Sequence, residues 1–316
     1  MKKLDNSRRD FIKKSAMASS SLVLPTNLVF KKHVTENNIP KVYIFSKQLQ
    51  FLNYIDMCDA TKEMGFDGLD LTVRAKGHVL PEKVADDLPK VTEVMHLYKL
   101  TPQLITTKIS DTQLPSTKLL LKTASDLGYT HYRPSYFKYK KDTPVLKTVE
   151  TVQNSFIQLE KLNNKFSINL AYQNHSGHYF GASIWDLHQV LAKMTVNNIG
   201  SQYDIMHATV EGGKNWEVGF HLIKPYINSV VLKDFKWVKT NNKWEIKYTP
   251  LGDGMVDFDR FFKLLKENKI NAPICLHAEY DLGGAEHGNT PSISQQEVFK
   301  RLKQDLNFIK RKWNHI

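Results

Sequence analysis

The residues best equipped for chemistry in this sequence stand where short apolar runs come to an end. The run "INLAY" breaks into Gln173, Asn174 and His175, and a later run ends at Asp204, with His207 three residues beyond it. Carboxylate, imidazole and amide oxygen together make a ligand set for a divalent ion such as Mn²⁺, Mg²⁺, Co²⁺ or Zn²⁺. These clusters contain no cysteine, which argues against a structural thiolate zinc site.

Further polar residues follow the same rule. Lys233 and Asp234 close another apolar run, while His277 and Glu279 are two residues apart in the last one, so a strand points both to the same side. Histidine titrates near neutrality, and a lysine beside a metal can lose its proton more readily. The candidates for moving a proton are therefore His175, His78, His277 and Lys233.

Two arginines, Arg74 and Arg133, also end apolar runs, and we predict that they bind oxyanions. Each of these residues has a structural alternative. The Lys233-Asp234 pair can form an internal salt bridge, and the histidines, amides and arginines can brace their neighbours.

Eight short apolar segments, each followed by a helical pattern, would position these residues. They lie at about 42–46, 67–73, 102–106, 130–133, 166–173, 200–204, 229–233 and 273–279. This alternation predicts a parallel α/β fold, and eight units in about 275 residues predict a (β/α)₈ TIM barrel. An open doubly wound sheet is the alternative, but no glycine-rich loop follows the first strand. In a barrel the strands' carboxyl ends meet, which brings the polar residues together.

Two segments depart from this regular alternation. Residues 237–254 form a long insertion whose Thr-Asn-Asn turn predicts a hairpin. Residues 1–35 begin with Ser-Arg-Arg-Asp-Phe-Ile-Lys and continue into a weakly apolar run, as in a twin-arginine export signal. We therefore expect a periplasmic protein with one barrel domain over 36–316. The alternative for the first segment is a basic, disordered arm.

Charge and composition limit the partners. Residues 1–33 hold eight Lys or Arg and two Asp, which is half of the net charge of +12. The remaining lysines are scattered, which argues against nucleic acid as a partner. The sequence contains no internal run of about 18 apolar residues, so no internal membrane span is predicted. Cys58 and Cys275 lie far apart and are expected to be buried free thiols. Homo-oligomerisation is left open.

Six short motifs carry a family resemblance across residues 41–285. "DGLDLTV", "QNHSG", "YDIMHATVEGG", "LKDF", "PLGDGMVDF" and "LHAEY" resemble, in order and placement, the xylose isomerase-like barrels described as sugar phosphate isomerases/epimerases. The resemblance implies one divalent metal held by Glu, Asp, His and Glu at the ends of strands five to eight. In that family the metal polarises a sugar carbonyl, and acidic residues move a proton at the neighbouring carbon.

Only part of the family's set of metal ligands is present in this sequence. Asp204 and Glu279 match two metal ligands, and His207 matches a substrate contact beside the metal. Gln173 replaces the strand-five glutamate and Val231 the strand-seven histidine. An amide oxygen still binds a hard cation but cannot act as a base. The predicted metal set is Gln173, Asp204, His207 and Glu279, and the predicted catalytic residues are Glu279, Lys233 and His175. The predicted substrate-binding set is His207, Arg74, His78, Arg133, Asn174, His277 and Trp237.

We expect an exported sugar isomerase or epimerase that uses a divalent metal to assist proton removal next to a carbonyl. The predicted substrate is a small non-phosphorylated sugar or keto-sugar. A 3-keto-glycoside lyase or hydratase acting through the same enediolate is the first alternative, and a non-catalytic sugar-binding protein is the second. An endonuclease of this superfamily would need many more His and Glu ligands for a multi-zinc cluster.

Overall fold

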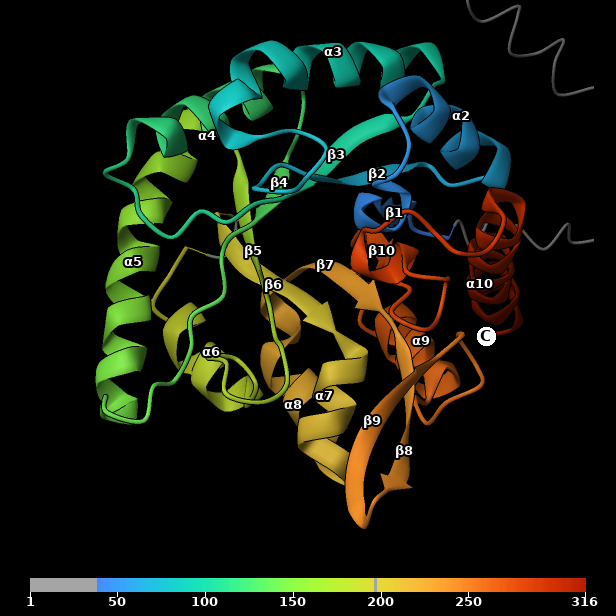
Figure 1. Ribbon diagram of the computed structural model, residues 1–316. Helices are drawn as coiled ribbons and strands as arrows, with labels where there is room; N and C mark the ends of the chain where they lie inside the picture. The colour runs from blue at the N-terminus through green and yellow to red at the C-terminus, as the bar shows by residue number, and fades with distance from the viewer. Residues whose placement is uncertain (1–38, 196–197) are drawn as a thin grey trace, which may run out of the picture. The chain divides into compact units, whose positions relative to one another are not determined.

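Eight parallel strands close into a barrel in the computed structural model, which describes residues 39–195 and 198–316 (Figure 1). Around the ring they run in the order β1-β10-β7-β6-β5-β4-β3-β2. Their bounds are Val42–Phe45 (β1), Gly68–Thr72 (β2), Thr101–Thr106 (β3), His131–Arg133 (β4), Asn169–Gln173 (β5), Ile199–Asp204 (β6), Ile227–Leu232 (β7) and Ile274–Leu276 (β10). The predicted (β/α)₈ barrel is confirmed.

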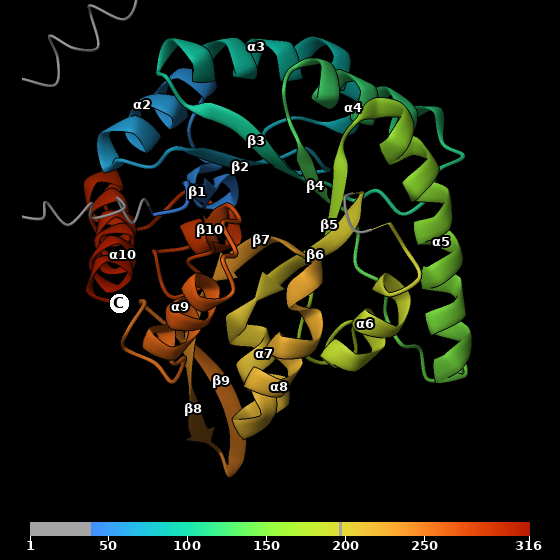
Figure 2. The ribbon, with the colours of Figure 1, turned by 180° about the vertical axis from the view of Figure 1, so that it is seen from behind.

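Helices form the outer layer, as the view from behind also shows (Figure 2). They span Tyr54–Met64 (α2), Val84–Leu97 (α3), Pro115–Asp126 (α4), Val145–Phe166 (α5), Ile184–Leu191 (α6), Ile205–Gly212 (α7), Trp216–Ile223 (α8), Phe258–Glu267 (α9) and Gln295–His315 (α10). In α9 the spacing of Phe258, Phe261, Phe262 and Leu265 puts four buried side chains on one face. Asp257 caps that helix by accepting the N–H of Arg260 at 2.9 Å.

The inside of the barrel is filled. Tyr43, Phe45, Leu104, Val231 and Cys275 form an apolar cluster of their own, separate from the larger core between strands and helices. A TIM barrel packed in this way is closed to ligands through its middle, so chemistry is confined to the carboxyl ends of the strands.

Two strand boundaries differ by three residues from the sequence prediction, and the others differ by no more than two. The fifth strand begins at Asn169 and not at 166, because α5 continues through Phe166 and ends where Ser167 takes a left-handed φ of 54°. The last strand ends at Leu276, so Glu279 lies on the loop beyond it.

The predicted hairpin is present and projects from the barrel (Figure 1). Strands β8 (Asp234–Thr240) and β9 (Lys243–Thr249) pair antiparallel, with a turn at Asn241 and Asn242, whose φ angles are 48° and 62°. Asp234 holds the returning loop, because its carboxylate accepts the N–H groups of Gly252, Gly254 and Val256 at 2.9–3.1 Å. Asp234 is therefore structural.

The predicted export signal lies outside the described residues. Within the described ranges no helix is long and apolar enough to cross a membrane. Cys58 and Cys275 are buried free thiols, as predicted.

Candidate active site

A buried carboxylate at the end of β6 organises the mouth of the barrel, which is the end where the carboxyl termini of the strands meet. Asp204 is 0% exposed, and its carboxylate accepts two hydrogen bonds and forms one ion pair. Oδ2 receives the Nε2 of Gln173 at 2.8 Å and the Nζ of Lys233 at 3.1 Å, and Oδ1 receives the N–H of His207 at 3.1 Å. The three donors come from three consecutive strand ends, so neighbouring strands of the ring bring them together.

Lys233 is the cation of this cluster. Burial lowers its pKa, but the carboxylates of Asp204 and Glu279 outweigh burial and raise the pKa above its ordinary value. The ammonium also lies 2.9 Å from Nε2 of His207, which must therefore accept the hydrogen bond. The Nδ1–H of His207 is then free to donate to Ser176 Oγ at 2.9 Å.

His175 covers this cluster. Its ring lies 4.0 Å from the ring of His207 and 5.1 Å from that of Tyr136, measured between centroids. Burial, and then the charge of Lys233, lowers the pKa of His175. The imidazole is therefore neutral at neutral pH and can accept a proton.

Glu279 provides an accessible carboxylate at the same mouth. Its two oxygens lie 3.2 and 3.0 Å from the Nζ of Lys47, and the two side chains are 19% and 18% exposed. Burial lowers the pKa of Lys47, and the charge of Glu279 opposes that change. Glu279 thus combines an oriented carboxylate with access from solvent.

Arg133 and Phe45 form another part of the mouth. Arg133 donates to the side-chain oxygens of Tyr136 and Gln173, which turns the amide of Gln173 so that its N–H₂ faces Asp204. The ring of Phe45 lies within 5.6 Å of three cationic groups, namely Lys47, Arg74 and Arg133. Positive charge therefore gathers around one aromatic face.

The structure thus brings together most of the predicted site residues, namely Gln173, Asp204, His207, Lys233, His175, Glu279, Arg133 and Arg74. Four predicted substrate contacts lie elsewhere or are fully engaged. The amide of Asn174 is used at both ends by the backbone of Asp204, at 2.9 and 2.8 Å. His277 is 2% exposed and stacks under Phe45 at 4.2 Å.

His78 and Trp237 are the other two residues outside the cluster. Both ring nitrogens of His78 have partners, Ser46 Oγ at 3.1 Å and Leu49 O at 3.2 Å, so this residue braces the loop after β2. Trp237 lies on the hairpin, 39% exposed, with its ring at a steep angle to that of Phe235. Position after a strand or on an insertion does not show how deeply a side chain is buried or which partners it has.

Four residues at the mouth were not predicted from the sequence. Lys47, Phe45, Tyr136 and Tyr248 all interact with the cluster, Tyr248 through the charges of Lys233 and Glu279 that act on its pKa. Lys47 had a signal, because it follows the end of β1 by two residues. Tyr136 and Tyr248 come from a loop and the inserted hairpin, for which strand ends give no guide.

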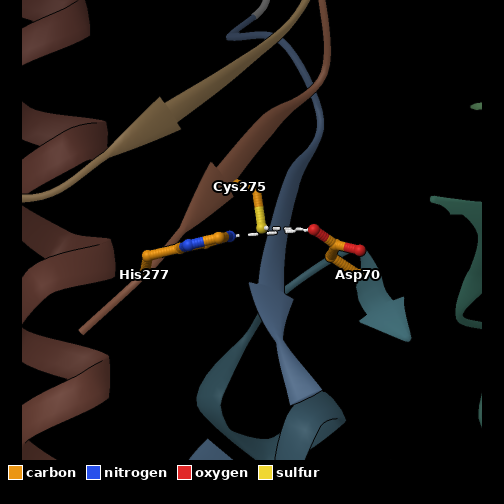
Figure 3. Close-up of side chains that lie close together, drawn as sticks. All are labelled: Asp70, Cys275 and His277. Atoms are coloured by element: carbon orange, nitrogen blue, oxygen red, sulfur yellow. Dashed lines mark hydrogen bonds and ion pairs between the residues drawn. The ribbon is translucent and has the colours of Figure 1, made fainter. Parts of the chain in front are cut away.

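One group of possible metal ligands lies below the mouth (Figure 3). Among the described residues, Asp70, Cys275 and His277 form the cluster of His, Cys, Asp or Glu whose ligand atoms all lie within 4.8 Å of one another. The Asp70 Oδ2 lies 3.5 Å from Cys275 Sγ and 3.7 Å from His277 Nε2. Burial raises the pKa of the thiol well above its ordinary value, which opposes the thiolate that a metal needs.

The four predicted ligands do not fit a divalent ion as the structure arranges them. The Asp204 carboxylate already holds the Lys233 ammonium and two N–H donors, and the oxygen of Gln173 faces Arg133 instead. Glu279 is bound to Lys47. Val231, in place of the family's histidine, belongs to the apolar cluster inside the barrel. The cation at this position is supplied by the chain itself.

Comparison with known proteins supports the fold described here. The family model described as "Xylose isomerase-like TIM barrel" matches residues 58–304. No curated protein matches the sequence at a significant level. A solved D-psicose 3-epimerase with D-tagatose from Clostridium cellulolyticum H10 superposes with a TM-score of 0.63 at 11% identity, covering 87% of this chain and 99% of that one.

Two further solved structures show the same fold. An L-ribulose 3-epimerase superposes with a TM-score of 0.67 at 11% identity, covering 88% of this chain and 95% of that one. The apo form of a 3-keto-D-glucoside 4-epimerase from E. coli gives 0.61 at 13% identity, covering 87% and 100%.

Proposed function

We propose, from the premise that the chain belongs to the xylose isomerase-like TIM barrel family, that it is a sugar isomerase or epimerase. Its substrate is a small keto-sugar, from which it removes a proton next to the carbonyl. The observation that carries this proposal is that the mouth holds both a partly exposed carboxylate, Glu279, oriented by Lys47, and a buried ammonium, Lys233, held by Asp204 and His207.

Lys233 supplies the charge that the developing enediolate needs. An ammonium has three N–H donors, and Asp204 and His207 engage two of them. The third is available to the carbonyl oxygen of the sugar. A pre-oriented donor in a site that excludes water stabilises an oxyanion strongly, because no solvent has to reorganise as the charge forms.

Glu279 is the proton acceptor in this proposal. Asp204 is engaged at both oxygens, whereas Glu279 is oriented by Lys47 and open to solvent. It takes the proton from the carbon next to the carbonyl and can return it to the adjacent carbon, which gives isomerisation. His175 stands beside His207 as a neutral imidazole that can accept a hydroxyl proton from the same sugar.

Metal assistance belonged to the sequence prediction and stays a prediction. In relatives a divalent ion would polarise the carbonyl, but the donors around Asp204 support a lysine there, and no step is derived through a metal. The trio of Asp70, Cys275 and His277 is the alternative place for an ion.

Two alternatives share the site. Expulsion of a group β to the carbonyl from the same enediolate would make the chain a 3-keto-glycoside lyase or hydratase, and one solved structure with this fold is a 3-keto-D-glucoside 4-epimerase. Binding of sugar without turnover would make it a binding protein. We place its action in the periplasm on the strength of the twin-arginine pattern in residues 7–13.

The deciding experiment incubates the purified chain with keto-sugars and 3-keto-glycosides in deuterated water. Deuterium on one carbon of recovered sugar supports isomerase or epimerase chemistry. Released aglycone supports the lyase. Absence of both from every sugar that binds would refute enzymatic function in favour of binding alone.

A further inference from the structure

The mouth of the barrel holds more positive charge than its carboxylates neutralise. Lys233 is paired with Asp204, and Lys47 with Glu279. Arg74 and Arg133 have no carboxylate within ion-pair distance among residues 39–195 and 198–316. Lys108, on the exposed rim next to Tyr136, adds a third cation without such a partner.

The two arginines are held close together. Their guanidinium carbons lie 5.4 and 5.5 Å from the centroid of the same Phe45 ring. Burial, and then the charge of Arg133, lowers the pKa of Arg74. Like charges in a partly buried place repel each other. Asp70, deeper in the barrel, offsets this only at a distance: the charges of Arg133 and Arg74 act on its pKa, but it forms no ion pair with either arginine in the described structure and accepts the hydroxyl of Thr106 at 2.9 Å.

Arg133 is also incompletely satisfied. It is 5% exposed, its Nη1 donates to Tyr136 and Gln173, and its buried Nε has no hydrogen-bond partner in the described structure. A buried guanidinium N–H without a partner costs free energy. Guanidinium groups bind carboxylates and phosphates through paired N–H donors, so an anionic ligand would satisfy both the charge and the geometry.

Resting on the proposed function, we infer that the substrate is an acidic sugar whose anionic group binds between Arg74 and Arg133 over Phe45. The neutral keto end of such a sugar then reaches Lys233 and Glu279. A carboxylate, as in a keto-uronate, and a phosphate offer the same chemistry to the arginines. The arginines therefore select for a negative charge on the sugar and not for a particular ring form or stereochemistry.

The test compares binding of three ketohexose ligands that differ only at carbon 6, which carries a neutral hydroxyl, forms a carboxylate or carries a phosphate. D-fructose, D-fructuronate and D-fructose 6-phosphate are titrated calorimetrically against the wild-type chain and the variants Arg74→Gln, Arg74→Lys and Lys62→Gln. Lys62 is exposed on α2, so its variant makes the same charge change away from the site. Thermal unfolding of each variant confirms that it is folded.

At least one acidic sugar is expected to bind about tenfold more tightly than fructose, an advantage that narrows at high salt. Arg74→Gln should lose most of this advantage, Arg74→Lys should keep part of it because the charge but not the paired donors remains, and Lys62→Gln should keep all of it. The tighter of the two acids identifies the anionic group. Equal affinities for fructose and both acids, or an advantage that survives in Arg74→Gln, overturn the inference. The difference in affinity between acidic and neutral sugars is read from binding and not from a product, so failure of the isomerase proposal in deuterated water is a separate result.

Discussion

The ammonium of Lys233 and the carboxylate of Asp204 form a buried ion pair, with 3.1 Å between Nζ and Oδ2 and side-chain exposures of 4% and 0%. The family resemblance implies a metal ion beside this aspartate, whereas in this structure a lysine side chain supplies positive charge at that place.

Replacing Lys233 tests that relationship. Lys233→Met should slow deuterium exchange into the sugar by about 10²–10³-fold, because it removes the donor for the enediolate oxygen. It also leaves Asp204 buried without a counter-charge, at a cost of about 3–5 kcal/mol in unfolding free energy. The double variant Asp204→Asn/Lys233→Met should recover most of that stability but none of the rate. Recovery of the rate as well would show that Lys233 serves folding only.

Metal content provides an independent test. Protein purified without chelator should contain no stoichiometric metal that depends on Asp204, and a chelator should leave the rate of exchange unchanged. The matched variants are Asp204→Ala and Cys275→Ser. Stoichiometric metal lost in Asp204→Ala would restore the sequence prediction, whereas metal lost only in Cys275→Ser would place the ion at Asp70, Cys275 and His277.

Glu279→Gln should abolish proton removal with little effect on the fold, because Glu279 is partly exposed and its isostere keeps the shape. We expect a loss of about 10²–10⁴ in exchange rate, the usual contribution of a general base. Calorimetry with the unreacted sugar measures binding separately. Exchange at the wild-type rate in this variant would show that Glu279 is not the base. His175→Gln would then be the next variant to examine.

The buried histidines should lower stability as the solution is acidified below neutral pH, against the opposite contribution of Asp186 and Asp305, whose pKa burial raises to about 6 and about 7. Burial lowers the pKa of His78 to about 4 and those of His207 and His277 well below their ordinary value. The unfolded chain therefore takes up protons below about pH 6.5 that the folded chain refuses, at up to about 1.4 kcal/mol per pH unit for each histidine.

Urea unfolding at several values between pH 7 and about pH 4 measures this slope. His78→Gln should make the slope shallower, since it removes one of the depressed groups. His96→Gln, on the exposed side of α3, is the control and should follow the wild type. A slope unchanged in His78→Gln would contradict the assignment.

The sequence predicted the barrel well because apolar strand segments and helical periodicity are both visible in short stretches of sequence. Apolar runs and helical periodicity repeat eight times, and the rule that strand ends converge then brings Gln173, Asp204 and Lys233 together without any contact information. The departure at Val231 was also informative, since alternation along β7 turns Val231 into the barrel and leaves Lys233, two residues on, at the mouth.

The differences between the predicted site and the observed arrangement have a shared physical origin. Whether a polar residue is free depends on partners far along the chain, as when His78 is engaged by Ser46 and the carbonyl of Leu49. The ion pairs of Lys233 and Lys47 are likewise invisible in sequence, because they join residues 29 and 232 positions apart. The charge state of the site follows from those distant pairings.

The ion pair between Lys47 and Glu279 also determines at which stage of barrel assembly the site is complete. Lys47 follows β1 and Glu279 follows β10, the two strands that meet where the ring closes. A chain that has assembled only its first seven barrel strands lacks Glu279, the proton acceptor of the proposed function. Under that proposal, turnover requires the last barrel strand to join the ring.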